Sequence, residues 1–550
     1  MIARTSVFLA AFVALASAQS QWCGKNYMAT QPIVPPGGNF PTPATSSSPL
    51  LALRCGPAIK PYLVSDAHAG TKGAILVDAP ITFSHIANAA PIALPGHPSS
   101  QKLDVTITLA GHGTLARASV PLNASKFEIP FSLSGLKAST TPLDVTCSAT
   151  LGKQSFKASA KVPFLPDNTN GSVTKLDMRT GGLLAKPATG ADGPYAPVFP
   201  IGFYTSFGGF LADNLTALDD IKAAGYTVVH PIPTFDNLTA LDVVVTRMQE
   251  LGLYLMYDMR WTYTNLTGVT EEVNRIKNRP NLLLWYTGDE PDGWEDPQNA
   301  TQLAYDTIYG LDSGYHPVSL VLNCQDYYFT EYSAGADIVM QDVYMIGNNL
   351  TFSSQWGTVC TPDYGDCGCD NCKGVFEDIS DRIDSFHSRQ QILGRELSQS
   401  VWTVPQAFGN DTYWKRYPTG AEYTVTAALA INHGATGVVA WDQPAPDDLL
   451  AAASALAAAL EPAKAFIFSP EAEYAQSATD RVDVASWTVG SRALLLVTNL
   501  NYEAKTVPIP AALRAAARAE LKQVLDTGAK IVGENIVLES VGTGAFILGR

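Results

Sequence analysis

Apolar and polar residues follow two different periodicities along the chain. Between about residues 60 and 165 they alternate, as in the segments LDVTITL at 103–109 and FEIPFSL at 127–133. A strand with one buried face has this period of two, and the Gly, Asn and Pro residues between such segments are typical of turns. This part of the chain therefore predicts an antiparallel β-sandwich.

From about residue 198, continuous apolar runs alternate with segments of helical spacing, such as the one that carries Leu215, Leu218 and Ile221. Continuous apolar runs are expected of parallel strands that are buried on both faces. Eight such strand–helix units over about 260 residues predict a (β/α)8 barrel, or TIM barrel. The expected strands span 198–204, 227–232, 253–257, 282–286, 318–322, 338–343, 401–404 and 437–441.

Alternating segments return after an Ala-rich helix at 450–463, which predicts a smaller β-domain at the C-terminal end. The expected fold class is α/β, with a TIM barrel flanked by an N-terminal β-sandwich and a small C-terminal β-domain. The expected divisions are a signal peptide (1–18), a Pro/Gly/Ser-rich arm (19–59), the β-sandwich (60–172), a connector (173–197), the barrel (198–463) and the C-terminal β-domain (464–550).

The first residues predict export. Arg4 precedes an apolar run at 7–16 that is too short to span a bilayer, and Ala16-Ser17-Ala18 supplies small residues for cleavage. This pattern favours a removed signal peptide over a buried first helix. Eight Asn-x-Ser/Thr sequons behind it predict a secreted, extracellular glycoprotein. They begin at Asn123, Asn170, Asn214, Asn237, Asn265, Asn299, Asn349 and Asn410.

The eight cysteines form an even set, which predicts disulfides in an oxidising compartment. Cys367-Gly-Cys369-Asp-Asn-Cys372, with Cys360 upstream, also resembles a zinc site, but four thiolates so close together would form a cramped tetrahedron. A disulfide-stapled loop is therefore favoured over a metal site. This loop follows the sixth expected strand, so it is expected to wall a cleft at the mouth of the barrel.

Net charge narrows the range of partners. The chain carries a formal charge of −15 and no basic stripe, so neither a nucleic acid nor a membrane is expected as a partner. The motifs of serine esterases, zinc proteases, phosphate-binding loops and dinucleotide folds are absent from the sequence. We expect no cofactor and no metal. The oligomeric state is open, with a monomer as the default.

The carboxyl ends of the expected barrel strands carry the candidate chemistry, because the active-site loops of a TIM barrel open there. Those ends combine carboxylates, amides and tryptophans, with Arg260 as the one cation. Amides and carboxylates bind hydroxyl groups, and indole rings stack on the apolar faces of sugars. This set predicts a neutral, polyhydroxylated ligand, and we expect a glycan.

The strongest local signal is Trp285-Tyr286-Thr287-Gly288-Asp289-Glu290-Pro291 at the end of the fourth strand. It resembles the strand-4 motif of the barrel glycoside hydrolase superfamily, in which Asn-Glu-Pro carries the general acid/base. The resemblance covers about residues 175–445 and implies that Glu290 is the acid/base and that Asp289, in place of Asn, binds the sugar. The alternative interpretation of Glu290 is a helix cap or a surface ion pair.

The second catalytic carboxylate departs from that pattern. The superfamily has a Glu at the end of strand 7, where this chain has Gln406, which is not a nucleophile. Asp342 on strand 6 is the expected replacement as base or nucleophile, with Asp258 and Asp442 as further candidates. Asp342 could instead orient Arg260 or hold a sugar hydroxyl.

The other candidate residues are assigned to substrate binding. They are Asp289, Asp258, His230, Trp285, Tyr344, Gln406, Trp441 and Asp442. The tryptophans, including Trp402, could equally pack the top of the barrel, and His230 could be a hydrogen-bonded rim residue. The expected function is a secreted glycoside hydrolase that cleaves O-glycosidic bonds. The rival hypothesis is a carbohydrate-binding or wall-associated barrel protein without turnover.

Overall fold

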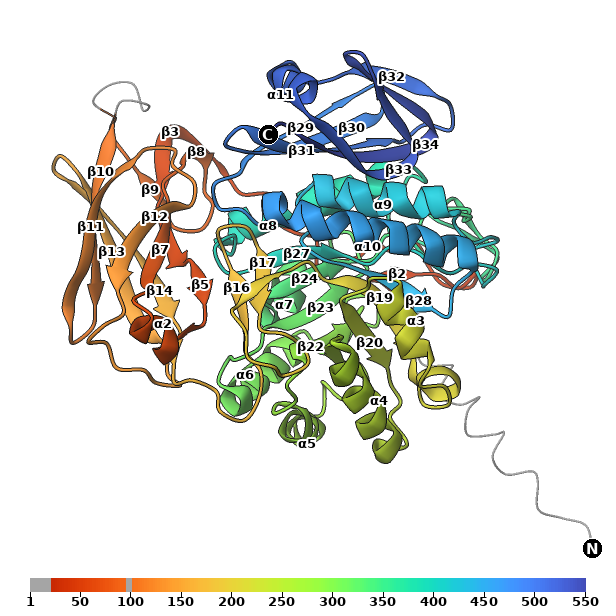
Figure 1. Ribbon diagram of the computed structural model, residues 1–550, viewed down its shortest axis with the longest axis horizontal. Coiled ribbons are helices and arrows are strands. Elements are labelled where there is room, and N and C mark those ends of the chain that lie inside the picture. The colour runs from red at the N-terminus through yellow and green to blue at the C-terminus, as the bar shows by residue number, and fades with distance from the viewer. Residues whose placement is uncertain (1–20, 95–100) are drawn as a thin grey trace, which may run out of the picture.

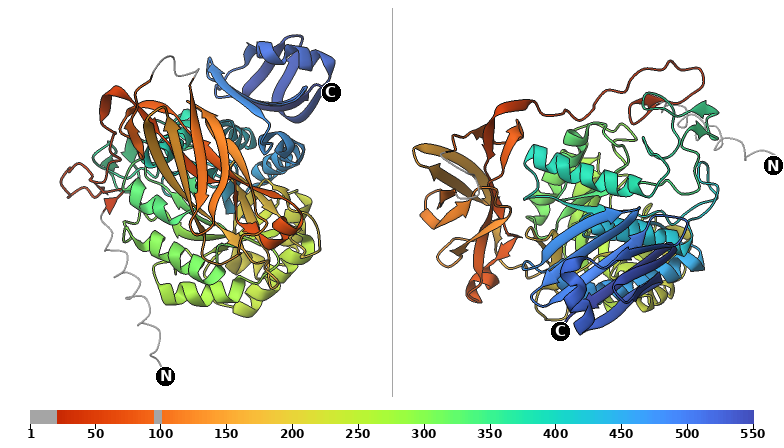
Figure 2. Two further views of the ribbon diagram at one scale, coloured as in Figure 1. Left: turned by 90° about the vertical axis from the view of Figure 1, so that its left-hand side faces the viewer. Right: turned by 90° about the horizontal axis from the view of Figure 1, so that it is seen from above.

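The computed structural model of the protein describes residues 21–94 and 101–550. The predicted signal peptide at 1–18 lies outside the described residues. Three parts are visible in Figure 1: a β-sandwich, a barrel surrounded by helices, and a second sheet that covers one side of the helical layer. The sandwich and the second sheet lie on different sides of the barrel in both views of Figure 2.

Eight parallel strands close into a barrel in chain order, which confirms the predicted fold class. Each strand is an almost uninterrupted apolar run, because the barrel interior buries one face and the helices bury the other. The strands are β19 (Ile201–Ser206), β20 (Val228–Ile232), β21 (Tyr254–Asp258), β22 (Leu282–Asp289), β23 (Val318–Leu322), β24 (Ile338–Gln341), β27 (Ser400–Thr403) and β28 (Val438–Gln443).

The helices surround the barrel (Figure 1). They are α3 (Ala217–Ala223), α4 (Leu238–Leu251), α5 (Leu266–Ile276), α6 (Ala300–Asp312), α7 (Phe329–Tyr332), α8 (Glu377–Leu393), α9 (Gly420–Asn432) and α10 (Asp447–Ile467). By length and composition α10 could cross a membrane. In this structure it packs against α9 and the C-terminal sheet, and Leu449, Leu456 and Leu460 are buried.

The sandwich begins earlier in the chain than the sequence predicts. Its three sheets have the orders β11-β10-β13-β14, β12-β7-β4 and β8-β3-β9. The strands β3 (Thr45–Ala52) and β4 (Arg54–Pro57) belong to it, although their residues were assigned to the arm. The serine-rich first half of β3 is largely exposed and resembles a linker in composition, whereas Leu50 and Leu51 are buried. The other strands are β7 (Lys72–Asp78), β8 (Ile81–Ser84), β9 (Ala89–Pro91), β10 (Lys102–Leu109), β11 (Gly113–Pro121), β12 (Phe127–Ser132), β13 (Leu143–Leu151) and β14 (Gln154–Val162).

Two further sheets complete the fold. The connector forms a small sheet of β5 (Ile59–Lys60), β16 (Thr174–Asp177), β17 (Gly182–Ala185) and β18 (Ala196–Val198). The C-terminal sheet packs on α9 and α10. It consists of β29 (Glu473–Thr479), β30 (Val482–Val489), β31 (Arg492–Asn499), β32 (Lys505–Pro508), β33 (Leu521–Val532) and β34 (Asn535–Leu548).

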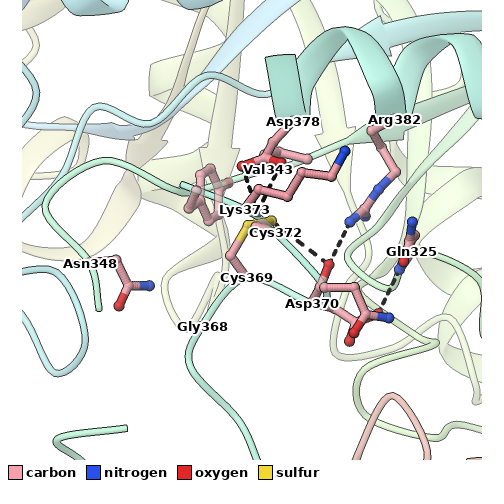
Figure 3. The surroundings of a disulfide bond; sticks show 12 residues. Gln325, Val343, Asn348, Gly368, Cys369, Asp370, Cys372, Lys373, Asp378 and Arg382 are labelled. Atoms are coloured by element: carbon pink, nitrogen blue, oxygen red, sulfur yellow. Dashed lines mark hydrogen bonds between the residues drawn. A yellow bond between two sulfur atoms is a disulfide. The ribbon is translucent and has the colours of Figure 1, made fainter. Parts of the chain in front are cut away.

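All eight cysteines form disulfides, as the sequence predicts: Cys23–Cys324, Cys55–Cys147, Cys360–Cys367 and Cys369–Cys372. The last two staple the long loop after β24. Figure 3 shows how this loop is fastened: the guanidinium of Arg382, on α8, donates to the backbone oxygen of Asp370, whose carboxylate accepts the backbone N–H of Gln325. The cysteine cluster is therefore a fixed wall, and its thiolates are not free to bind zinc.

The N-terminal arm crosses the molecule from the sandwich to this loop (Figure 2, right). Its short strands β1 (Gln21–Trp22) and β2 (Lys25–Asn26) form a hairpin next to the loop, where the backbone N–H of Gly365 donates to Asn26 and the hydroxyl of Thr358 donates to the backbone oxygen of Tyr27. Cys23 ties the arm to Cys324, just beyond β23. The arm therefore reaches the end of the barrel at which its strands have their carboxyl ends.

Candidate active site

Glu290 lies immediately after β22, at the mouth of the barrel. Its backbone adopts a positive φ of 52°, and Pro291 follows, so the strand ends here and the side chain turns toward the neighbouring strand ends. Its backbone N–H still donates to Val321 on β23, at 3.2 Å. The side chain is partly exposed.

Asn323, just after β23, links the two carboxyl groups that the sequence proposes as catalytic. Its amide nitrogen donates to Glu290 Oε1 at 3.0 Å and to Asp342 Oδ1 at 3.3 Å. Its amide oxygen accepts the indole N–H of Trp22 at 3.0 Å. Because the indole can only donate, this contact fixes which end of the Asn323 amide faces the carboxyl groups.

The carboxyl groups of Glu290 and Asp342 accept hydrogen bonds from the same amide nitrogen and influence each other's pKa. Burial, and then the charge and hydrogen bond of Asp342, raise the pKa of Glu290 well above its ordinary value. Burial also raises the pKa of Asp342, but the hydrogen bonds from Glu290 and Asn323 oppose that rise. Of the two groups, Glu290 is therefore the one whose protonated form is favoured more strongly.

A second network of buried charges lies beside this pair. His230 Nε2 and Arg260 Nε contact Asp258 Oδ2 at 2.7 and 2.8 Å, and a second guanidinium nitrogen of Arg260 donates to Asp289 Oδ2 at 2.9 Å. Tyr286 donates its hydroxyl to Asp289 Oδ1 at 2.5 Å. Burial alone would raise the pKa of Asp258, but Arg260 and His230 hold it below its ordinary value. The carboxylates of Asp258 and Asp289 thus neutralise Arg260, the one cation expected at the carboxyl ends of the barrel strands.

Glu290 opens into a pocket of about 420 Å³. Most of the pocket wall is aromatic, and it comes from four segments: the N-terminal arm and the loops after β22, β24 and β27. The aromatic residues are Trp22, Tyr27, Trp294, Tyr344, Trp356, Tyr413 and Trp414. Asp366, from the cysteine-stapled loop, is the second carboxylate that lines the pocket. This volume lies within the range of small-molecule sites.

Only some of the catalytic and substrate-binding residues expected from the sequence line the pocket. Glu290 and Tyr344 line it, and Asp342 lies behind them. His230, Asp258 and Asp289 form the charge network described above, and Trp441 lies over the guanidinium of Arg260, 4.9 Å from the ring centroid. Asp442 follows Trp441 on β28, and burial raises its pKa to about 6.

Of the residues assigned to substrate binding, Tyr344 alone is among those that line the pocket, and Trp285 and Gln406 pack elsewhere. Trp285 is fully buried and packs edge-on against Tyr257 and His316. Gln406 is buried and bonds the backbone of Ile346 through both ends of its amide. These two side chains hold the structure together and do not offer a surface to a ligand. Trp402 is also fully buried, with its ring against Gly437.

Several pocket residues were not identified from the sequence. Trp22 belongs to a segment that composition identifies only as an arm, and Asp366, Trp356 and Trp414 belong to long loops. The available signal for Trp22 was its position next to Cys23, but the partner of Cys23 cannot be deduced from sequence. Asn323 directly follows the expected strand at 318–322, but nothing in the sequence distinguishes its role.

Comparison with known proteins finds a limited similarity, and only to solved structures. No family model and no curated protein matches the chain. Among solved structures, a β-glucuronidase from Ruminococcus gnavus has 11% identity and a TM-score of 0.33, over 70% of this chain and 61% of that one. An α-amylase from Geobacillus thermoleovorans has 10% identity and a TM-score of 0.41, over 62% and 92%. A GH30 endoxylanase from Clostridium papyrosolvens has 11% identity and a TM-score of 0.40, over 64% and 97%.

The chain thus spans about three fifths of the length of the R. gnavus β-glucuronidase. The three neighbours are glycoside hydrolases, and no particular family is established for this chain. With TM-scores below 0.5 and identities near 10%, these matches carry no argument about the reaction. The chemistry has to be argued from the residues of the pocket.

Proposed function

We propose that the protein is a glycoside hydrolase in which Glu290 is the general acid. The observation that carries the proposal is a carboxyl group with a strongly raised pKa that opens into an aromatic-walled pocket. A general acid has to be protonated near the working pH, and burial together with a carboxylate neighbour produces that state. The indole and phenol faces of the wall suit stacking on sugar rings.

In this proposal Asp342 controls the proton of Glu290. Glycosidases that use a carboxylate nucleophile place it about 5 to 5.5 Å from the acid, and those that activate a water place the base about 6.5 to 9.5 Å away. Glu290 and Asp342 both accept from the amide nitrogen of Asn323, at 3.0 and 3.3 Å, so they lie close together on the same side of the site. Asp342 is therefore better suited to hold Glu290 protonated than to attack the sugar, which differs from the role that the sequence suggests.

Trp22 and Asn323 set the geometry of the pair. Asn323 donates to both carboxyl groups, and Trp22 fixes the orientation of the Asn323 amide. The Trp22 ring is itself held: it packs edge-on against Trp294, with ring centroids 5.3 Å apart, and a Cβ at Gly293 would lie 2.4 Å from it. Trp22 therefore acts as a positioning residue as well as a pocket wall.

We propose that the protein is secreted and N-glycosylated. Its four disulfides are consistent with an oxidising, extracellular location. The asparagines of all eight sequons are exposed, which glycosylation requires: Asn123, Asn170, Asn214, Asn237, Asn265, Asn299, Asn349 and Asn410.

A second function, sugar recognition without turnover, is favoured by one observation. Gln406 bonds the backbone of Ile346 at the strand end where the superfamily has its second Glu. This function predicts that glycans bind, that no reducing ends are released, and that Glu290→Gln leaves binding unchanged.

Replacing Glu290 with Gln tests the general acid. The amide keeps the size of the side chain but cannot donate a proton as an acid, so glycosidic cleavage should fall at least about a hundredfold. Released reducing ends measure the rate, and the exposed Glu331→Gln serves as the control with the same chemical change. A Glu290→Gln protein as active as the wild type would show that another group supplies the proton.

Replacing Asp342 with Asn tests the origin of the raised pKa. Glu290 must be protonated to act, so activity is present below its pKa and is lost as the pH rises through it. Because Asp342 raises that pKa, Asp342→Asn should move the alkaline limb of kcat/KM toward lower pH by about one unit or more. The exposed Asp213→Asn is the control. An alkaline limb at the wild-type pH would contradict the assignment.

Replacing Trp22 with Phe tests the positioning role. Phenylalanine keeps a ring against Trp294 but lacks the N–H that fixes Asn323, so kcat should fall about tenfold and the pH profile should shift. Trp294→Phe alters the same wall without touching Asn323, and its pH profile should match that of the wild type. Equal profiles for wild type and Trp22→Phe would leave Trp22 as a wall residue alone.

A further inference from the structure

The pocket wall contains aromatic rings and carboxyl groups but no basic side chain among the described residues that line it. Glu290 and Asp366 are its two acidic residues. The faces of Trp and Tyr rings carry negative partial charge and attract cations. A ligand that carries a carboxylate or a sulfate would find no cationic side chain on this wall, which disfavours acidic sugars.

Three basic residues whose partners adjoin the pocket are already committed to those partners. Arg260 is paired with Asp258 and Asp289 and is almost completely buried. Lys25 forms an ion pair with Asp370, and Arg382 donates to the backbone oxygens of Asn323 and Asp370. None of the three is a free countercharge for a bound anion.

Asp366 is a carboxylate held in place without a cation. It accepts the hydroxyl of Tyr413 and, at 2.8 Å, the backbone N–H of Gly368. Burial raises its pKa, and those two hydrogen bonds only partly offset the rise. Among the described residues no Lys, Arg or His forms an ion pair with Asp366. A positively charged ligand would supply the missing partner.

We infer that the pocket binds a sugar that carries a protonated amine, an amino sugar such as glucosamine in an oligosaccharide, with Asp366 and the surrounding aromatic rings as the recognition site for the ammonium group. This inference rests on the proposed function and names its substrate class. The formal charge of −15 also favours a cationic glycan, because it attracts positive charge from solution.

Three tetrasaccharides that differ only at C2 test the inference: β-1,4-linked glucosamine, N-acetylglucosamine and glucose. Their binding to the full-length Glu290→Gln protein is measured by titration calorimetry at low salt, at a pH where the amine is protonated. We expect the glucosamine oligomer to bind at least about tenfold more tightly than the other two. The preference should shrink with added salt, and should disappear as the pH rises through the pKa of the amine.

A second variant assigns the preference to Asp366. Asp366→Asn, added to Glu290→Gln, should remove most of the preference for the amine and leave the binding of the two neutral oligomers unchanged. Asp363→Asn is the matched control, because it removes the same charge from an exposed position in the same loop. If Asp366→Asn does not fold, the inference is tested by the salt and pH dependence of the preference for glucosamine, measured in the Glu290→Gln protein.

Equal or tighter binding of a neutral oligomer, or no binding of any of the three, would overturn the inference. The outcome is separable from the proposed function, since binding is measured without turnover. Tight binding of the glucosamine oligomer without cleavage by the wild type would end the proposal of hydrolysis alone. Cleavage of neutral glycans with no preference for the amine would end the inference alone.

Discussion

The electrostatic interaction between the carboxyl groups of Glu290 and Asp342, which both accept from Asn323, is the interaction on which the site depends. Two neighbouring carboxyl groups cannot both be ionised at a modest cost, so the protonated form of one of them is favoured. The neighbouring charges favour protonation of Glu290. Asn323 donates to both carboxyl groups, but the negative charges of Asp342, Asp289 and Asp292 all raise the pKa of Glu290. A protonated acid at the mouth of a barrel is the result.

The barrel topology creates this contact. Residues 290, 323 and 342 are far apart in sequence but follow the neighbouring strands β22, β23 and β24, whose carboxyl ends meet at the same rim. The disulfide Cys23–Cys324 then brings Trp22, from the opposite end of the chain, onto Asn323. The proposed active site and its aromatic wall are thus assembled from the barrel, one arm and a stapled loop.

The barrel could be predicted from the sequence because its strands are buried on both faces and therefore appear as apolar runs, as in Val318–Leu322. Glu290 was found through the motif at the end of such a run. The assignment of Trp285 to the rim ignored the period of two along the strand: Leu284 and Tyr286 belong to one core cluster, and Trp285 belongs to the cluster with the helices. Trp22 and Asp366 could not be predicted, since their places depend on disulfide pairing and on a long loop.

The protonation state of Glu290 tests the central claim most directly. Infrared difference spectra between the wild type and Glu290→Gln at pH 7 report whether this side chain carries a protonated carboxyl group. We expect a carboxylic acid carbonyl band in the wild type that the variant lacks. A difference spectrum that shows only the loss of an ionised carboxylate would contradict it.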